Sequence, residues 1–113
     1  MILMILTASL FFTAPVLAVE VVVIETNHGD ITVELDNEKA PISVANFLTY
    51  AESNHYDGTI FHRVIPGFMI QGGDPNTKDL DKPETYGQGG PSQRLKAEFN
   101  DIPHRRGILS MAR

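Results

Sequence analysis

A short stretch near the start of the chain contains the pattern that most restricts how it can fold. Residues 21–24 are four consecutive β-branched side chains, and residues 31–35 alternate apolar with polar side chains, as a half-buried strand does. Between them, Gly29 can adopt the positive φ of a tight turn, and Asn27 and Asp30 can bond the backbone amides of the turn. These features predict an antiparallel β-hairpin with one strand buried on both faces or nearly so.

One amphipathic helix is predicted after the hairpin. Pro41 suits the first position of a helix because it has no backbone N–H to leave unpaired. Apolar residues then recur at intervals of three and four, so they share one face of the helix. These residues are Val44, Phe47, Leu48 and Ala51. The helix is therefore expected to cover an apolar surface.

Two more strands are predicted over residues 59–65 and 68–71, separated by a Pro-Gly pair. Residues 75–91 are almost all polar and form a predicted long surface loop, of the kind that is usually functional or flexible. Residues 94–99 are expected to form a short element. Residues 107–111 are expected to start a further strand.

The composition indicates one ordinary domain and excludes several kinds of site. The 113 residues include no Cys, which excludes a disulfide framework, a thiolate nucleophile and a cysteine-ligated metal centre. The formal net charge of -5 argues against a nucleic-acid partner. The four His residues have no metal-ligand spacing, and residues 87–90 are followed by neither the lysine nor the helix start of a phosphate-binding loop. No cofactor is predicted.

The start of the chain has the pattern of an export signal. Residues 1–19 contain no charged side chain, and an apolar run leads into a proline and several small residues. Val16 and Ala18 suit the positions three and one before a cleavage site, which predicts a signal peptide over residues 1–18 and a domain over residues 19–113. The alternative is an uncleaved membrane anchor, since about 17 to 25 apolar residues can span a bilayer.

Arg63 is the first candidate for a functional residue. Under strand alternation it shares a face with Phe61 and Ile65, and a guanidinium on an apolar face is costly to bury unless it is paired or functional. On the next predicted strand, Met69 and Gln71 also share one face. An arginine, a soft apolar side chain and an amide could therefore converge on one surface. The alternative is that Arg63 points to solvent at a sheet edge.

A run of 14 residues, 61–74, closely resembles the signature of the cyclophilin-type peptidyl-prolyl cis-trans isomerases. Its sequence is Phe-His-Arg-Val-Ile-Pro-Gly-Phe-Met-Ile-Gln-Gly-Gly-Asp. Other similar segments follow in the order of the family, namely residues 26–35, 40–47, 87–90, 97–99 and 107–113. The resemblance covers nearly all of the chain after the predicted signal, and it is weakest over residues 76–86.

The resemblance implies a fold, an activity and a set of site residues. The fold is mainly β, a cyclophilin-like antiparallel β-barrel with a capping helix, and the substrate lies in a groove on its outer surface. The activity is acceleration of rotation about X-Pro bonds. The resemblance implies that Arg63 is the catalytic arginine and that Gln71 is a hydrogen-bond partner of the substrate backbone.

Four more residues are implied in the substrate groove. Phe68 and Met69 match residues that line the proline pocket, although Phe68 joins the face of Met69 only if the backbone is still turning after the Pro-Gly pair. Ala112 matches a groove position. Arg113 stands where many members carry asparagine beside the peptide backbone, a substitution that resembles the bacterial exported branch.

The domain of the family continues beyond the segment matched by residues 107–113, and its later segments complete the groove. We therefore expect a C-terminally truncated domain whose barrel is incomplete in this chain. Three interpretations stay open: an exported, periplasmic isomerase whose sequence is recorded incompletely, a module that binds proline peptides without turnover, and a non-functional product. The expected partners are proline-containing, unfolded or partly folded polypeptides, with neither nucleic acid nor stable membrane insertion after signal cleavage.

Overall fold

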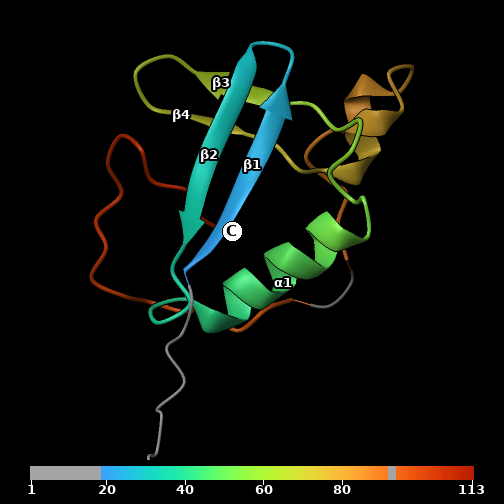
Figure 1. The fold of residues 1–113 in the computed structure, drawn as a ribbon. Helices are drawn as coiled ribbons and strands as arrows, with labels where there is room; N and C mark the ends of the chain where they lie inside the picture. Colours follow the sequence, from blue (N-terminus) through green and yellow to red (C-terminus); the bar gives the residue numbers. More distant parts are fainter. Residues whose placement is uncertain (1–18, 92–93) are drawn as a thin grey trace, which may run out of the picture.

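The computed structural model describes residues 19–91 and 94–113, so the predicted signal peptide lies outside the described residues. Within these residues, a first antiparallel hairpin is followed by one α-helix, a second antiparallel hairpin and two short 3-10 helices (Figure 1). Their bounds are β1 Glu20–Thr26, β2 Gly29–Leu35, α1 Pro41–Glu52, β3 Arg63–Ile65, β4 Met69–Gln71, η1 Pro75–Lys78 and η2 Pro83–Thr85. The predicted mainly β class with one helix is confirmed.

β1 and β2 form the predicted hairpin, in a register that pairs Ile24 with Ile31. The expectation that one of its strands is buried on both faces is wrong. Val21 and Val23 are 55% and 53% exposed, whereas Val22 and Ile24 on the other face are half-buried. A run of β-branched residues favours a strand, but burial of its second face requires a second layer, and the described chain packs none there.

The hairpin turn of the described chain is stabilised by Thr26 and not by the predicted side chains of Asn27 and Asp30. Oγ1 of Thr26 accepts a hydrogen bond of 3.0 Å from the N–H of His28 and donates one of 2.6 Å to the carbonyl of Gly29. Gly29 has a φ of 111°, in the positive region that the turn was predicted to need. The hydroxyl takes this role because Thr26 ends β1, where a short side chain reaches the backbone of the turn.

α1 begins at its proline, as predicted, and lies beside the end of the first hairpin opposite the turn (Figure 1). Within its apolar stripe, Val44 is 5% exposed and Phe47 and Leu48 are half-buried, while Ala51 is exposed. The ring centroid of Phe47 lies 5.1 Å from that of Tyr56, so the stripe packs partly on the loop that leads to β3. Neither α1 nor any other helix of the described residues is long and apolar enough to cross a membrane.

β3 and β4 are shorter than the strands predicted over residues 59–65 and 68–71. The Pro-Gly pair forms the predicted turn, closed by a hydrogen bond of 3.0 Å from the N–H of Phe68 to the carbonyl of Ile65. The segment before β3 does not extend the strand. The N–H of Thr59 bonds to the carbonyl of Tyr56, and the N–H of Ile60 bonds to the side chain of Thr77, after β4.

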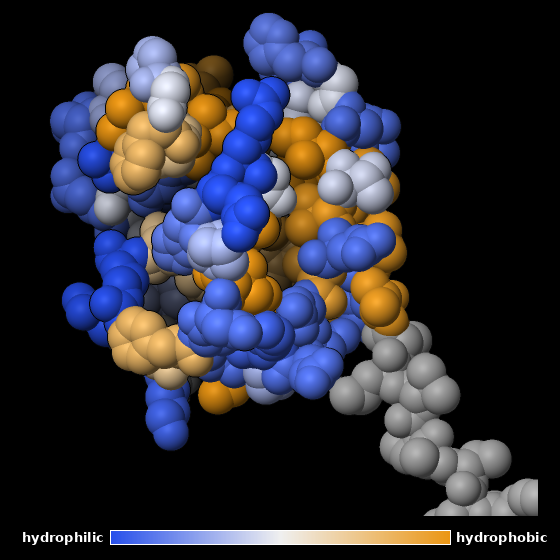
Figure 2. Space-filling model, turned by 90° about the vertical axis from the view of Figure 1, so that its left-hand side faces the viewer, coloured by the Kyte–Doolittle hydropathy of each residue, from blue (hydrophilic) through white to orange (hydrophobic). Residues whose placement is uncertain are grey.

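The element predicted over residues 94–99 and the strand predicted over residues 107–111 are both irregular backbone. A strand needs a hydrogen-bonded neighbour, and none of the described strands pairs with either segment. Apolar side chains of both hairpins also stay exposed, and Figure 2 shows apolar surface open between polar side chains on one face of the molecule. The exposed apolar side chains of the two hairpins include Val21, Val23, Ile31, Val64 and Ile70. The described strands therefore form two open sheets, in agreement with the expectation of an incomplete barrel.

The predicted surface loop over residues 75–91 is organised around one carboxylate. Asp74 is 7% exposed and accepts hydrogen bonds from the N–H groups of Asn76 at 2.8 Å, Gly87 at 2.5 Å and Gly89 at 3.2 Å. Gly89 has no room for a side chain, because a Cβ there would lie 2.7 Å from Cγ of Asn76 and closer still to Oδ1 of Asp74. The N–H groups of Gly87 and Gly89 are thus engaged by Asp74.

Candidate active site

The structure places Arg63 directly across from Gln71 in the antiparallel pair formed by β3 and β4. Residues that face each other in this way have Cβ atoms about 4.5 to 5.5 Å apart on the same face of the sheet. Ile65 and Met69 form the other pair on that face, because side chains two residues apart along a strand point the same way. The register therefore brings together the arginine, the methionine and the amide that strand alternation predicted to converge.

The face of the β3–β4 sheet that carries Arg63, Ile65, Met69 and Gln71 is called the Arg63 face below. It is open to solvent at the arginine. Arg63 is exposed, whereas Met69 and Gln71 are half-buried. Within the described chain Arg63 forms no ion pair, so the donors of its guanidinium are free for a ligand. The functional interpretation of Arg63 and the alternative of a solvent-facing edge residue both fit this geometry, since a substrate also arrives from solvent.

The remaining groove residues implied by the resemblance lie outside the Arg63 face. Phe68 occupies the last position of the turn before β4, so the backbone is still turning there, and its side chain is 77% exposed. Ala112 and Arg113 are exposed residues of irregular backbone. Cζ of Arg113 lies 4.6 Å from the ring centroid of Phe99, a cation–π contact that the sequence reasoning missed.

Two buried polar residues, Asp74 and Thr77, connect the two ends of the β3–β4 hairpin. Oγ1 of the fully buried Thr77 accepts a hydrogen bond of 3.0 Å from the N–H of Ile60, before β3, and donates one of 2.6 Å to the carbonyl of Asp74, after β4. Both ends of the hairpin are therefore tied to one 3-10 turn, which holds the Arg63 face in place. An aspartate directly before a proline is a sequence signal of a capped helix start, and Asp74 is the N-cap residue of η1.

The Asp74 carboxyl is held in its charged form. Burial alone would raise its pKa, but the backbone N–H groups of Asn76, Gly89 and Gly87 and the attraction of His62 together outweigh burial. The pKa of Asp74 is therefore lower than its ordinary value of 3.8.

Acid is expected to destabilise the fold through this carboxyl. A group whose pKa is lower in the folded than in the unfolded state adds stability above the unfolded value and loses it as the pH falls through the folded value. For Asp74 this window starts near pH 3.8 and extends below it. Urea titrations should therefore give a smaller free energy of unfolding at pH 3 than at pH 6, and Asp74→Asn should reduce that difference. An equal difference in the variant would contradict the role of Asp74.

Other candidate sites are few. Within residues 19–91 and 94–113, no group of three or more His, Asp or Glu side chains could hold a metal ion. A shallow hollow lies over η1 and η2, and it contains none of the site residues implied by the resemblance. Its lining residues are Pro75, Asn76, Lys78, Asp79, Lys82 and Thr85.

Known proteins match the chain over nearly all of its described residues. Residues 21–113 match the family described as cyclophilin type peptidyl-prolyl cis-trans isomerase/CLD. A peptidyl-prolyl cis-trans isomerase of Synechococcus elongatus is 44% identical over 90 residues, which cover 80% of this chain and 57% of that protein. A peptidyl-prolyl cis-trans isomerase of Acinetobacter baylyi is 44% identical over 110 residues, which cover 96% of this chain and 55% of that protein. Peptidyl-prolyl cis-trans isomerase B of Escherichia coli is 44% identical over 95 residues, which cover 81% of this chain and 52% of that protein. The chain spans about half the length of these curated relatives.

Proposed function

Because the chain belongs to the cyclophilin-type peptidyl-prolyl cis-trans isomerase family, we propose that it accelerates rotation about X-Pro bonds. The observation that carries the proposal is the pairing of the exposed Arg63 with Gln71 across the β3–β4 sheet. The substrates are proline-containing polypeptides that are unfolded or partly folded, because such chains expose X-Pro bonds to an open surface.

The chemistry needs only selective binding of a twisted amide. An X-Pro bond resists rotation by about 18 to 20 kcal/mol because the nitrogen lone pair is delocalised into the carbonyl group. Rotation accelerates when the protein binds the twisted amide better than the planar one. A donor directed at the prolyl nitrogen localises the lone pair on that atom and weakens the partial double bond. No covalent bond to the substrate forms or breaks.

The side chains on and beside the Arg63 face can provide the hydrogen bonds and the apolar contacts that this selective binding needs. The planar guanidinium of Arg63 presents several N–H donors, which can hold a carbonyl oxygen while approaching the prolyl nitrogen. Gln71, directly opposite, offers an amide that can bond the substrate backbone. Met69 lies on the same face and Phe68 precedes it in the turn, so both can supply apolar contact for the proline ring.

The test is exchange NMR spectroscopy on a tetrapeptide with one Ala-Pro bond. We expect exchange between the cis and trans resonances to accelerate in proportion to the concentration of the added protein. Chemical-shift changes that report binding, without faster exchange, would instead identify a binding module. Absence of binding together with a non-cooperative urea transition would identify a non-functional product.

We also propose that the protein acts after export, in the periplasm. Support comes from the uncharged apolar segment that ends in the small or compact residues Val16 and Ala18. The match to the Acinetobacter relative covers 96% of the chain and so extends into this segment. The intact mass of the protein from a periplasmic fraction tests the proposal, and a chain that begins at Val19 is expected. An uncleaved chain in the membrane fraction would identify an anchor instead.

A further inference from the structure

The first turn of α1 has no cap from its own sequence. The N-cap position is Ala40, which offers no side-chain acceptor, and no acidic residue lies in the first turn. The start of a helix leaves several backbone N–H groups without a partner inside the helix. Pro41 has no N–H, and the N–H of Val44 bonds to the carbonyl of Ala40 at 2.9 Å. The N–H groups of Ile42 and Ser43 are therefore the two that need an acceptor.

Glu98 supplies both acceptors from a distant part of the chain. Its Oε2 accepts a hydrogen bond of 2.9 Å from the N–H of Ile42, and its Oε1 accepts one of 2.6 Å from the N–H of Ser43. The carboxylate also lies at the positive end of the helix dipole, where negative charge is stabilised. Burial alone would raise the pKa of Glu98, but the hydrogen bonds from Ile42 and Ser43 lower it, so the carboxyl is charged at neutral pH.

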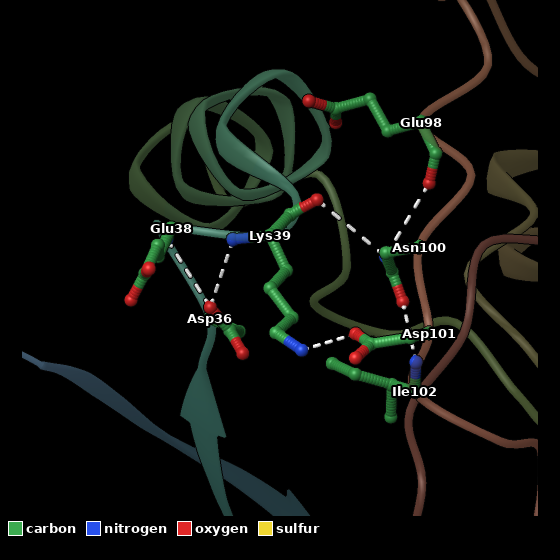
Figure 3. Close-up of polar contacts among 7 residues, drawn as sticks. All are labelled: Asp36, Glu38, Lys39, Glu98, Asn100, Asp101 and Ile102. Carbon is green, nitrogen blue, oxygen red and sulfur yellow. Dashed lines mark hydrogen bonds and ion pairs between the residues drawn. The ribbon is translucent and has the colours of Figure 1, made fainter.

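Residues next to Glu98 tighten the same junction (Figure 3). Nδ2 of Asn100 donates to the carbonyls of Lys39 and Glu98, and Nζ of Lys39 pairs with the carboxylate of Asp101. Oδ1 of Asn100 accepts a hydrogen bond of 3.0 Å from the N–H of Ile102. The segment that begins at Glu98 is thus fastened to the start of α1 by several side chains.

The end of the described chain returns to this junction. Cζ of Arg113 lies 4.6 Å from the ring centroid of Phe99, the residue that directly follows Glu98. Between Phe99 and Arg113 in the sequence, the Ser110 hydroxyl lies 3.2 Å from Nε2 of His104 and forms a hydrogen bond across the loop. The loop from Phe99 to Arg113 is therefore closed on itself beside the helix start.

We infer that Glu98 is a positioning residue: it anchors Phe99 to the start of α1, and Phe99 holds Arg113 in place at the substrate groove. The inference rests on the proposed function and on the resemblance to the family, which implies that Arg113 lies beside the substrate backbone. The hydrogen bonds of the Glu98 carboxylate lead to α1 and not to the Arg63 face. Loss of the anchor is therefore expected to weaken the binding of substrate and transition state equally, which raises KM and leaves kcat unchanged.

The test compares Glu98→Ala and Glu98→Gln with Glu34→Gln in the full chain. Glu34 is an exposed residue of β2 for which the described structure gives no side-chain hydrogen bond, so Glu34→Gln is a matched loss of charge. For a tetrapeptide with one Ala-Pro bond, Glu98→Ala should raise KM by about 5-fold and leave kcat unchanged. This is the size of effect expected from the loss of one exposed cation–π contact. Glu98→Gln should fall between Glu98→Ala and the wild type, because its amide oxygen still accepts one bond. Glu34→Gln should match the wild type.

NMR spectroscopy gives a readout that does not depend on turnover. The ring current of Phe99 shifts the side-chain protons of Arg113, and this shift should disappear in Glu98→Ala. If the shift persists and KM is unchanged, the inference is wrong. If the wild-type chain shows no turnover, the proposed function fails, whereas loss of the Arg113 shift in Glu98→Ala still supports the anchor.

Phe99→Leu removes the contact between Phe99 and Arg113 but leaves the hydrogen bonds from Glu98 to α1 in place. It remains informative if Glu98→Ala does not fold. This variant should raise KM by about 5-fold as well, because the same cation–π contact is lost. The amide hydrogens of Ile42 and Ser43 should keep their wild-type protection from exchange, since Glu98 is untouched. A wild-type KM in Phe99→Leu would show that Phe99 does not hold Arg113 for substrate and would overturn the inference.

Discussion

Replacing Arg63 with alanine is expected to slow X-Pro isomerisation by about 100- to 1000-fold, the loss that follows removal of one preorganised donor from a transition state. The side chain is exposed and forms no ion pair in the described chain, so its removal should leave the fold intact. Exchange NMR spectroscopy on the Ala-Pro tetrapeptide gives kcat/KM, and a urea titration of the same sample reports whether the chain is folded.

Two further variants define what Arg63 contributes. Arg94→Ala removes the same charge from an exposed position outside the β3–β4 hairpin, and it should retain the wild-type rate. Arg63→Lys keeps the charge but lacks the planar fork of donors, so most of the loss should remain. A rate in Arg63→Ala within about 3-fold of the wild type, at an unchanged urea midpoint, would reject Arg63 as the catalytic donor.

Asp74→Ala is expected to lower the free energy of unfolding by about 3 kcal/mol, because three backbone N–H groups lose a charged acceptor in a buried place. Those groups belong to Asn76, Gly87 and Gly89, so the loop that packs against the base of the β3–β4 hairpin loses its anchor. Urea unfolding followed by circular dichroism measures the change.

Asp57→Ala is the matched control for this loss. Asp57 is exposed, and the described structure gives its side chain no hydrogen bond, so its removal should leave the urea midpoint near the wild-type value. Asp74→Asn should recover only part of the stability, because its amide oxygen can still accept from Asn76 but its NH2 group faces the N–H groups of the two glycines. Equal midpoints for Asp74→Ala and Asp57→Ala would contradict the role assigned to Asp74.

Local patterns were enough to predict the first hairpin, the presence of two more strands around the Pro-Gly pair, the start of α1 and a surface on which Arg63, Met69 and Gln71 could converge. Alternation, turn chemistry and the preference of proline for a helix start all act between near neighbours in the chain. Local patterns were not enough to predict burial. β1 was expected to be buried on both faces, but Val21 and Val23 are exposed, because burial depends on which layers pack against a strand.

By itself, the sequence determined where the strands turn, where α1 begins and which side chains share a strand face, because each depends on residues a few positions apart. The tertiary structure alone decided that Asp74 gathers the N–H groups of Gly87 and Gly89, that Glu98 caps α1 and that Arg113 lies on Phe99. These contacts join residues from 13 to 56 positions apart. A carboxylate or a ring accepts many partners, and folding decides which of them come within reach.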